Sequence, residues 1–242
     1  IQFKNISFTY PDTGIQALKN ISFRLKENET LGIFGKTGSG KSTIANLMCR
    51  LYDSSEGTIT FGEKNIKKLN LSDLRQNIGY VPQDGFLFSG TVNENISFGK
   101  DKFIEEEIKQ AARIAEIEDE IENFPKKYET IIGERGVQLS GGQRQRISIA
   151  RAIFINPPIF IFDDSLSAID ANKEQKILKN LKNKTENNTN IIISHRTSSL
   201  KNSHHIIVLD NGSISEEGTH NYLIKQNGFY AQMHKKQTTE NL

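Results

Sequence analysis

A short glycine-rich stretch, GKTGSGKS at residues 35–42, limits most strongly what this chain can fold into. It satisfies the pattern G-x-x-x-x-G-K-[ST], which requires a buried strand before the loop and a helix after it. The apolar run TLGIFG ends at Gly35, and STIANLMCRLY from Ser42 onward repeats apolar residues at helical spacing. This context predicts a phosphate-binding loop rather than a glycine-rich turn without a ligand.

The residue types of this loop suit the binding of a nucleoside triphosphate. Glycines allow successive backbone N–H groups to point at phosphate oxygens, and the start of the helix adds the positive end of its dipole. We expect Lys41 to contact the β- and γ-phosphates and the Ser42 hydroxyl to ligate Mg²⁺. The loop alone does not distinguish kinases, GTPases and ATPases. The predicted binding residues are Gly35, Lys36, Thr37, Gly38, Ser39, Gly40, Lys41, Ser42 and Thr43.

The rest of the chain predicts an α/β fold. Strand-like runs alternate with helical runs after an N-terminal meander, which indicates a mostly parallel sheet with an antiparallel β region at the N-terminus. Residues 1–10 alternate in the manner of an edge strand, and Asn211-Gly212 predicts a hairpin turn. Residues 103–124 read as one or two exposed amphipathic helices, and QTTENL at 237–242 reads as a frayed end.

These patterns predict a single domain over residues 1–242. Its core covers about 1–82 and 155–236, and an inserted helical lobe covers about 84–153. Its one cysteine, Cys49, predicts a reducing compartment and a small buried core residue. No apolar run approaches the roughly 18 to 20 residues that span a bilayer. The first residues lack both an initiator Met and a signal-peptide pattern, so we expect a segment of a longer protein.

The charge balance argues against nucleic acid as a partner. The chain has 31 basic and 29 acidic residues, a formal net charge of +2, and no basic stripe. Arg144 and Arg146 in the segment RQR form one short cluster, which we interpret as a solvated helix face. The run EEE at 105–107 is interpreted as the exposed start of a helix, where acids suit the dipole.

A second candidate site lies at LSGGQ, residues 139–143. Ser140 stands where a helix is expected to begin, and Gly141 and Gly142 expose backbone N–H groups there. This is a second helix start able to bind an anion. Ser140 could equally be an ordinary helix N-cap, and the segment by itself leaves both interpretations open.

Taken together and in chain order, the motifs resemble those of the ATP-binding cassette (ABC) family. The resemblance extends over nearly the whole chain. The corresponding segments are Tyr10 in FTYP as the aromatic residue at adenine, GKTGSGKST as Walker A, Gln83 in YVPQD as the Q-loop, LSGGQ as the signature, IFIFDD as Walker B, SAID as the D-loop, and His195 in ISHR as the switch histidine.

The resemblance implies a role for each of these residues. Tyr10 would stack on adenine, and Gln83 would ligate Mg²⁺ or its water. His195, at the end of strand NIIIS, would hydrogen-bond the γ-phosphate and the attacking water. In the family two such domains close head to tail, so that each ATP lies between the Walker A loop of one domain and the signature of the other. The signature residues carried over are Ser140, Gly141, Gly142 and Gln143.

Two segments resemble the exporter type of the family. They are QDGFLFSGTVNENISFG after the Q-loop and GERGVQ before the signature, in which Glu134 would face the coupling helices of a transmembrane domain. The expected partners are therefore a second nucleotide-binding domain, as a homodimer or a heterodimer, and a transmembrane domain that is absent from this chain. The expected location is the cytoplasmic face of a cell membrane.

Two adjacent acids, Asp163 and Asp164, end the apolar strand IFIF. Asp163 would ligate Mg²⁺ together with Ser42. Asp164 stands where most active members of the family have Glu, the residue that activates the attacking water. Its side chain is shorter by one methylene, about 1.5 Å, and a general base must lie within about 3 Å of its proton donor.

This substitution predicts slow hydrolysis at the chain's own site and suggests half of a heterodimeric exporter. The alternatives are an ATP-binding regulatory half with negligible hydrolysis, and a soluble ABC protein acting on ribosomes or DNA. Kinase and GTPase interpretations leave LSGGQ unexplained. The histidines at 204, 205, 220 and 234 are expected to be surface or structural residues, without a metal site.

Overall fold

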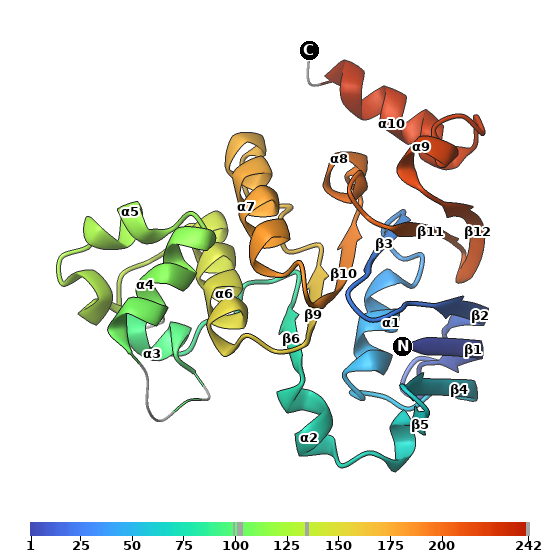
Figure 1. Cartoon of the computed structure of the whole chain (residues 1–242), viewed down its shortest axis with the longest axis horizontal. Coiled ribbons are helices and arrows are strands. Elements are labelled where there is room, and N and C mark those ends of the chain that lie inside the picture. Colours follow the sequence, from blue (N-terminus) through green and yellow to red (C-terminus); the bar gives the residue numbers. More distant parts are fainter. Residues whose placement is uncertain (99, 101–103, 134–135, 241–242) are drawn as a thin grey trace. The chain divides into compact units, whose positions relative to one another are not determined.

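The computed structural model describes residues 1–98, 100, 104–133 and 136–240, which form two compact units (Figure 1). The first, here the terminal unit, comprises residues 1–78 and 188–242. The second, here the middle unit, comprises residues 79–187 and is wider than the expected lobe, because it also includes the strand and helix between residues 159 and 184. The expected division at 84–153 stays a prediction.

The antiparallel N-terminal sheet of the terminal unit has the strand order β2-β1-β4-β5. Its strands are β1 (Gln2–Thr9), β2 (Gln16–Arg24), β4 (Glu56–Phe61) and β5 (Lys64–Asn65). The prediction that β1 is an edge strand was wrong, since it pairs antiparallel with both β2 and β4. Its alternation has another cause: Phe3, Ile6 and Phe8 are buried on one face while their neighbours face outward.

The terminal unit also holds strands in the order β12-β11-β3-β10. These are β3 (Thr30–Gly35), β10 (Thr189–Ser194), β11 (His205–Asp210) and β12 (Ser213–Gly218). β3 pairs parallel with β10 and β11, and β12 returns antiparallel through the predicted hairpin, where Asn211 and Gly212 have φ of 47° and 81°. β3 is buried almost throughout, as expected of a strand inside a parallel sheet. The predicted α/β fold is confirmed.

Helices flank these strands in the terminal unit. They are α1 (Lys41–Met48), the 3₁₀ turn η1 (Ile66–Lys68), α2 (Leu71–Gln76), α8 (Thr197–Leu200), α9 (His220–Leu223) and α10 (Phe229–Glu240). α1 contains the buried Cys49 at its C-cap, as predicted. The prediction that residues 237–240 are frayed was wrong, because α10 continues to Glu240 and Gln237 is hydrogen-bonded to the segment after β10. Residues 241–242 lie outside the described part.

The middle unit is mostly helical. Its elements are β6 (Ile78–Val81), β7 (Gly90–Thr91), α3 (Val92–Ile96), α4 (Glu105–Ile114), α5 (Glu118–Glu122), η2 (Lys127–Glu129), β8 (Ile131–Ile132), α6 (Gly141–Ile155), β9 (Ile159–Asp163) and α7 (Ala171–Lys184). α4 and α5 confirm the predicted amphipathic helices, and the three acids of α4 are exposed as expected. Both α3 and α4 pack against α6, which makes α6 the central helix of this unit (Figure 1).

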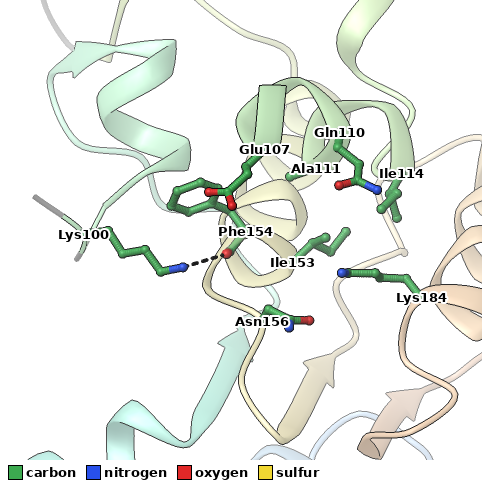
Figure 2. A pocket seen from close by; sticks show the side chains of 9 residues that line it. All are labelled: Lys100, Glu107, Gln110, Ala111, Ile114, Ile153, Phe154, Asn156 and Lys184. Atoms are coloured by element: carbon green, nitrogen blue, oxygen red, sulfur yellow. Dashed lines mark hydrogen bonds between the residues drawn. The ribbon is translucent and has the colours of Figure 1, made fainter. Parts of the chain in front are cut away.

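The C-terminal end of α6 is held by the backbone of Asn156 and by the side chain of Lys100. Asn156 adopts the left-handed conformation with φ of 51°, and its N–H donates to the carbonyl of Ala152 at 3.3 Å. Lys100 donates to the carbonyl of Phe154 at 3.4 Å and lies 4.8 Å from the centroid of that ring (Figure 2). A cation at this position complements the negative end of the helix dipole, so α6 ends in a defined place before β9.

Among the residues described, no helix has both the length and the apolar character needed to cross a membrane.

Candidate functional site

The glycine-rich loop connects β3 to α1 in the terminal unit, as predicted. Gly38 and Gly40 have φ of 81° and 102°, in the region that side chains disfavour. At Gly40 a Cβ would lie only 2.6 Å from the carbonyl oxygen of Ala17, so the loop has no room for any other residue there. Lys36, Thr37 and Gly38 are exposed at the tip, where their backbone is accessible to a ligand.

Lys41 and Ser42 begin α1 and have opposite exposure. Lys41 is 8% exposed and its ammonium donates to the carbonyls of Gly35 and Lys36 at 2.9 and 2.7 Å, while Ser42 is exposed. The hydroxyl of Ser39 is buried without a hydrogen-bond partner. These features fit a triphosphate with Mg²⁺. Lys41 supplies a positive charge at the loop, Ser42 an exposed hydroxyl at the start of the helix, and Ser39 a buried hydroxyl that lacks a partner.

Tyr10 lies beside this loop. Its hydroxyl is 3.0 Å from the hydroxyl of Thr43 in the first turn of α1. Its ring meets the rings of Phe8 and Tyr52 edge-on, at centroid distances of 4.9 and 5.3 Å. The structure therefore brings the residue predicted at adenine together with the predicted phosphate loop, on a half-exposed aromatic surface.

His195 follows β10 at the same sheet edge as the loop. β10 and β3 are parallel with Ser194 opposite Phe34, so His195 and Gly35 occupy equivalent positions at the two carboxyl ends. Parallel sheets place their ligands at this edge, and the His195 side chain is exposed there. The remaining histidines are structural or at the surface, as predicted: the Nδ1 of His204, for example, accepts from the Thr30 N–H at 2.9 Å.

The two acids occupy different environments at the end of β9 in the middle unit. Asp163 is 2% exposed, and its Oδ2 accepts a hydrogen bond from the Tyr80 hydroxyl at 3.2 Å. Asp164 is partly exposed and has φ of 48°, a left-handed conformation that Asp and Asn adopt more readily than other side chains. The left-handed backbone of Asp164 thus ends the extended conformation of β9, whose last residue is Asp163.

The signature forms the start of α6 with Ser140 as N-cap. The Ser140 hydroxyl accepts from the Gln143 N–H at 3.2 Å, and the Gln143 amide oxygen accepts from the Ser140 N–H at 2.8 Å, which is a complete capping box. Gly141 and Gly142, between them, carry the first N–H groups of the helix, which have no acceptor within the helix. The geometry accommodates both interpretations of Ser140, since a cap and an anion-binding helix start coincide here.

Glu120 connects three helices of the middle unit. Its carboxylate accepts from Gln143 at 2.9 Å, from Arg146 at 2.7 and 3.0 Å, and from Lys173 of α7. Burial would raise the pKa of Glu120, but these hydrogen bonds outweigh it and lower the pKa from 4.5 to about 2. The prediction that Arg146 lies on a solvated face was wrong: it is 5% exposed because it pairs with Glu120, whereas Arg144 is exposed.

We expect Glu120→Gln to destabilise the protein in a pH-dependent way. Because the folded pKa lies below the ordinary value, the ionised carboxylate contributes stability above pH 4.5 and loses it as the pH falls toward 2. The expected loss at pH 7 is about 2 kcal/mol, reduced from the full linkage value by partial exposure. Urea unfolding at several pH values measures it. The difference in the free energy of unfolding between the variant and the parent should become smaller below pH 4.5. A loss of stability that does not depend on pH would contradict this account.

A matched control is Glu107→Gln, an exposed acid in the first turn of α4. Its effect should stay within about 0.5 kcal/mol at every pH, as for other surface substitutions.

Gln145 connects the Q-loop and the D-loop, a role that the sequence analysis did not predict. This residue is 2% exposed; its amide nitrogen donates to the Gln83 carbonyl, and its amide oxygen accepts from the Ala168 N–H at 3.3 Å. Gly85 lies so close to α6 that a Cβ there would meet the Gln145 backbone nitrogen at 2.7 Å. The Q-loop and the D-loop are thus both fixed to α6. The only signal in the sequence was the position of Gln145 among arginines, which favoured the surface.

A cavity of about 650 Å³ opens beside the Q-loop within the middle unit. Gln83, Phe86, Leu139 and Arg144 are among its lining residues. Phe86 is 62% exposed, and its ring meets that of the 39% exposed Phe88 edge-on at 5.0 Å. The middle unit thus has two exposed aromatic side chains, Phe86 and Phe88, beside this cavity. Glu134, which the exporter resemblance singled out, lies outside the described residues.

Comparisons with known proteins agree with this geometry. A profile of the ABC transporter family matches residues 18–167. The chain is 47% identical, over 98% of its length, to the probable multidrug resistance ABC transporter ATP-binding/permease protein YheI of Bacillus subtilis, and covers 40% of it. An ATP-dependent lipid A-core flippase of Photobacterium profundum is 44% identical over 98% of the chain, which covers 41% of that protein.

The solved structure of a bacterial Atm1-family ABC exporter with ATP bound superimposes with a TM-score of 0.91 at 40% identity. The match covers 98% of this chain and 41% of that one. The chain thus spans about two fifths of the length of the relatives it matches. It belongs to the ABC transporter family, with the fold of the ATP-binding domain of an exporter-type member.

Proposed function

We propose that this chain binds and hydrolyses Mg-ATP in a head-to-tail dimer and thereby drives export through an attached transmembrane domain. ATP-binding domains of ABC exporters are ATPases coupled to transport. The observation that carries the proposal is the presence of two helix starts suited to phosphate, at Lys41 and at Ser140, in one chain. A single nucleotide needs one such cradle on each side when it lies between two domains.

The proposed nucleotide contacts divide between two copies of the domain. Tyr10 would stack on adenine, and residues 35–43 would surround the phosphates. Ser140, Gly141 and Gly142 of the other domain would contact the γ-phosphate from the opposite side. Gln143 would act by holding Ser140, because its side chain is committed to the Ser140 N–H and to Glu120.

The residues proposed for Mg²⁺ are Ser42, Gln83 and Asp163, all oxygen donors of the kind this ion prefers. When bound, the ion would neutralise charge on the β- and γ-phosphates. The Tyr80 hydroxyl donates to one oxygen of Asp163, and this bond fixes the orientation of the carboxylate. His195 would donate to the γ-phosphate from the carboxyl end of β10.

Asp164 would be a weak general base, so we propose that ATP at this chain's own site turns over slowly. The intact signature would complete the site of a partner, which makes the chain one half of a heterodimeric exporter. The short side chain of Asp164 favours a second candidate as well, an ATP-binding regulatory half with negligible hydrolysis. The two differ in whether any turnover depends on Asp164.

The relatives' names support the proposed transport role. One is named as an ATP-binding/permease protein and another as a flippase, and both are longer than this chain. The exposed Phe86 and Phe88 beside the cavity of the middle unit offer apolar contacts for the coupling helices of a transmembrane domain. The proposed location is the cytoplasmic face of a cell membrane.

Ser140→Arg is expected to abolish ATP-dependent dimerisation while ATP binding to the monomer is retained. A large cation at the helix start would block the approach of the partner's nucleotide, whereas the chain's own loop lies in the other unit and is unchanged. Sedimentation in Mg-ATP, combined with equilibrium nucleotide binding, separates the two effects. The measurement is best made with Asp164→Asn, which slows turnover during the run.

Ser72→Arg is the matched control, since Ser72 is an exposed serine of α2 outside the site. It should dimerise like the parent. Dimerisation of the Ser140→Arg variant would contradict the head-to-tail arrangement. A parent chain that binds ATP yet remains monomeric would exclude the homodimer and leave the heterodimer.

A further inference from the structure

We infer that Gln237, on the C-terminal helix α10, is a positioning residue for His195. The inference rests on the proposed role of His195 in ATP hydrolysis and adds a residue distant in the sequence that would set its orientation. Gln237 lies 42 residues after His195 and does not belong to any motif of the family resemblance.

The Gln237 side chain spans the segment that follows β10. Its amide nitrogen donates to the His195 carbonyl at 2.7 Å, and its amide oxygen accepts from the Thr197 N–H at 2.9 Å. The same oxygen lies 3.0 Å from the Thr197 hydroxyl, which donates to it. One amide group therefore holds the backbone on both sides of Arg196, immediately after the point where the regular pairing of β10 ends.

His234, one turn earlier on α10, reinforces this contact. Its Nδ1 is 3.0 Å from the Thr197 hydroxyl. With the hydroxyl proton committed to Gln237, the hydroxyl oxygen acts as acceptor, and His234 must carry its proton on Nδ1. Thr197 is only 1% exposed, so these bonds are shielded from water and fix the residue two positions after His195.

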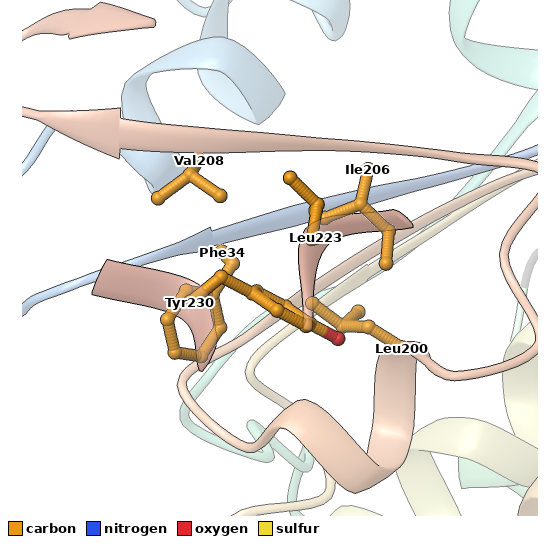
Figure 3. Packing of buried hydrophobic residues seen from close by; sticks show 6 residues of the cluster. All are labelled: Phe34, Leu200, Ile206, Val208, Leu223 and Tyr230. Atoms are coloured by element: carbon orange, nitrogen blue, oxygen red, sulfur yellow. The ribbon is translucent and has the colours of Figure 1, made fainter. Parts of the chain in front are cut away.

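α10 is itself anchored to the strand that leads into the phosphate loop. Tyr230, His234 and Gln237 are spaced by four and three residues, so they share one face of the helix. Tyr230 is fully buried, and its ring packs edge-on against Phe34 of β3 at 5.1 Å within a cluster of apolar side chains (Figure 3). Its hydroxyl lies 2.8 Å from the Nδ1 of His220.

Through these contacts α10 links two parts of the candidate site, the strand that leads into the phosphate loop and the segment that contains His195. Phe34 directly precedes Gly35, the first residue of the loop, and Gln237 holds the carbonyl of His195. The His195 side chain is exposed, and its backbone carbonyl is held by a side chain from a different element of the fold. Small displacements of a group that contacts the reacting phosphate lower turnover far more than they lower substrate binding.

Gln237→Met tests this role by removing both hydrogen-bonding atoms with little change in shape. We expect kcat for ATP to fall about tenfold or more, while the Kd for Mg-ATP stays within about twofold. Gln237→Glu is the second variant: it keeps an acceptor for Thr197 but sets a carboxylate against the His195 carbonyl, and it should also lower kcat. All variants are made in the full chain; steady-state hydrolysis of radiolabelled ATP gives kcat, and equilibrium binding of ATP with Mg²⁺ gives Kd.

Gln232→Met is the matched control, a glutamine on the exposed side of the same helix. It should leave both kcat and Kd at the parent values. Melting temperatures of all variants check that the assays are performed on folded protein.

A double-mutant cycle with His195→Ala separates positioning from a general structural role. If Gln237 acts through His195, then Gln237→Met changes turnover by less than about twofold once His195 is alanine. A parent-like kcat for both Gln237 variants, or fully additive losses, would overturn the inference while the role of His195 stands. A parent-like kcat for His195→Ala would instead overturn the proposed role of His195, and the inference with it.

Discussion

Lys41→Ala is expected to weaken ATP binding by about 100-fold or more, equivalent to about 2.7 kcal/mol. The Lys41 ammonium is held beneath the loop by the carbonyls of Gly35 and Lys36, so its charge is already in place before a nucleotide arrives. Charge-assisted hydrogen bonds to phosphate are stronger than neutral ones, and alanine removes all of them. Equilibrium binding of radiolabelled ATP with Mg²⁺ measures the loss directly.

Lys36→Ala is the matched control from the same loop. Lys36 is exposed, its ammonium lies 5.0 Å from the centroid of the Phe229 ring, and its proposed contact with phosphate is through the backbone N–H, which alanine retains. Its affinity for ATP should therefore fall less than tenfold. Parent-like binding by Lys41→Ala would refute the phosphate loop and every proposal that depends on it.

Asp164→Glu is expected to raise ATP turnover, by about 10²-fold if the longer side chain restores a general base. It should at the same time lower stability by about 1 kcal/mol, because the position has φ of 48° and Glu is less suited than Asp to left-handed backbone. A faster enzyme that is also less stable distinguishes a catalytic gain from a general improvement in folding. Steady-state phosphate release and urea unfolding measure the two quantities.

Asp164→Asn completes the series. Asn tolerates the same backbone as Asp but cannot accept a proton, so it should leave stability unchanged and lower any residual turnover. If the Asp164→Asn variant turns over ATP as fast as the parent, Asp164 does not contribute to catalysis, and this result supports the regulatory half. If Glu gives no rise, the short reach of Asp164 does not explain slow hydrolysis.

The local parts of the site could be predicted because each one depends on a few consecutive residues. The loop at 35–42, the turn at Asn211-Gly212 and the cap at Ser140 all follow from the preferences of adjacent residues, and each appears in the structure where it was expected. The family resemblance then supplied the order in which these parts occur, and with it the fold.

The contacts that hold those parts together could not be predicted in the same way. Arg146 and Lys173 meet at Glu120, which is 26 and 53 residues away from them, and Gln145 reaches Gln83 across 62 residues. Charged and amide side chains normally favour solvent, and the arginines of the RQR segment were accordingly interpreted as a solvated helix face. Only pairing across the fold makes the burial of Arg146 and Gln145 favourable.

The close approach of Gly85 to α6 has a consequence for how binding could be communicated. The Q-loop passes α6 with no space for even one methyl group, and Gln145 ties the same loop to the helix that starts at Ser140. Close-packed contacts transmit displacement instead of absorbing it. A shift of Gln83 on nucleotide binding would therefore displace the signature by a similar amount. In the proposed dimer, this displacement would communicate nucleotide binding to the other domain.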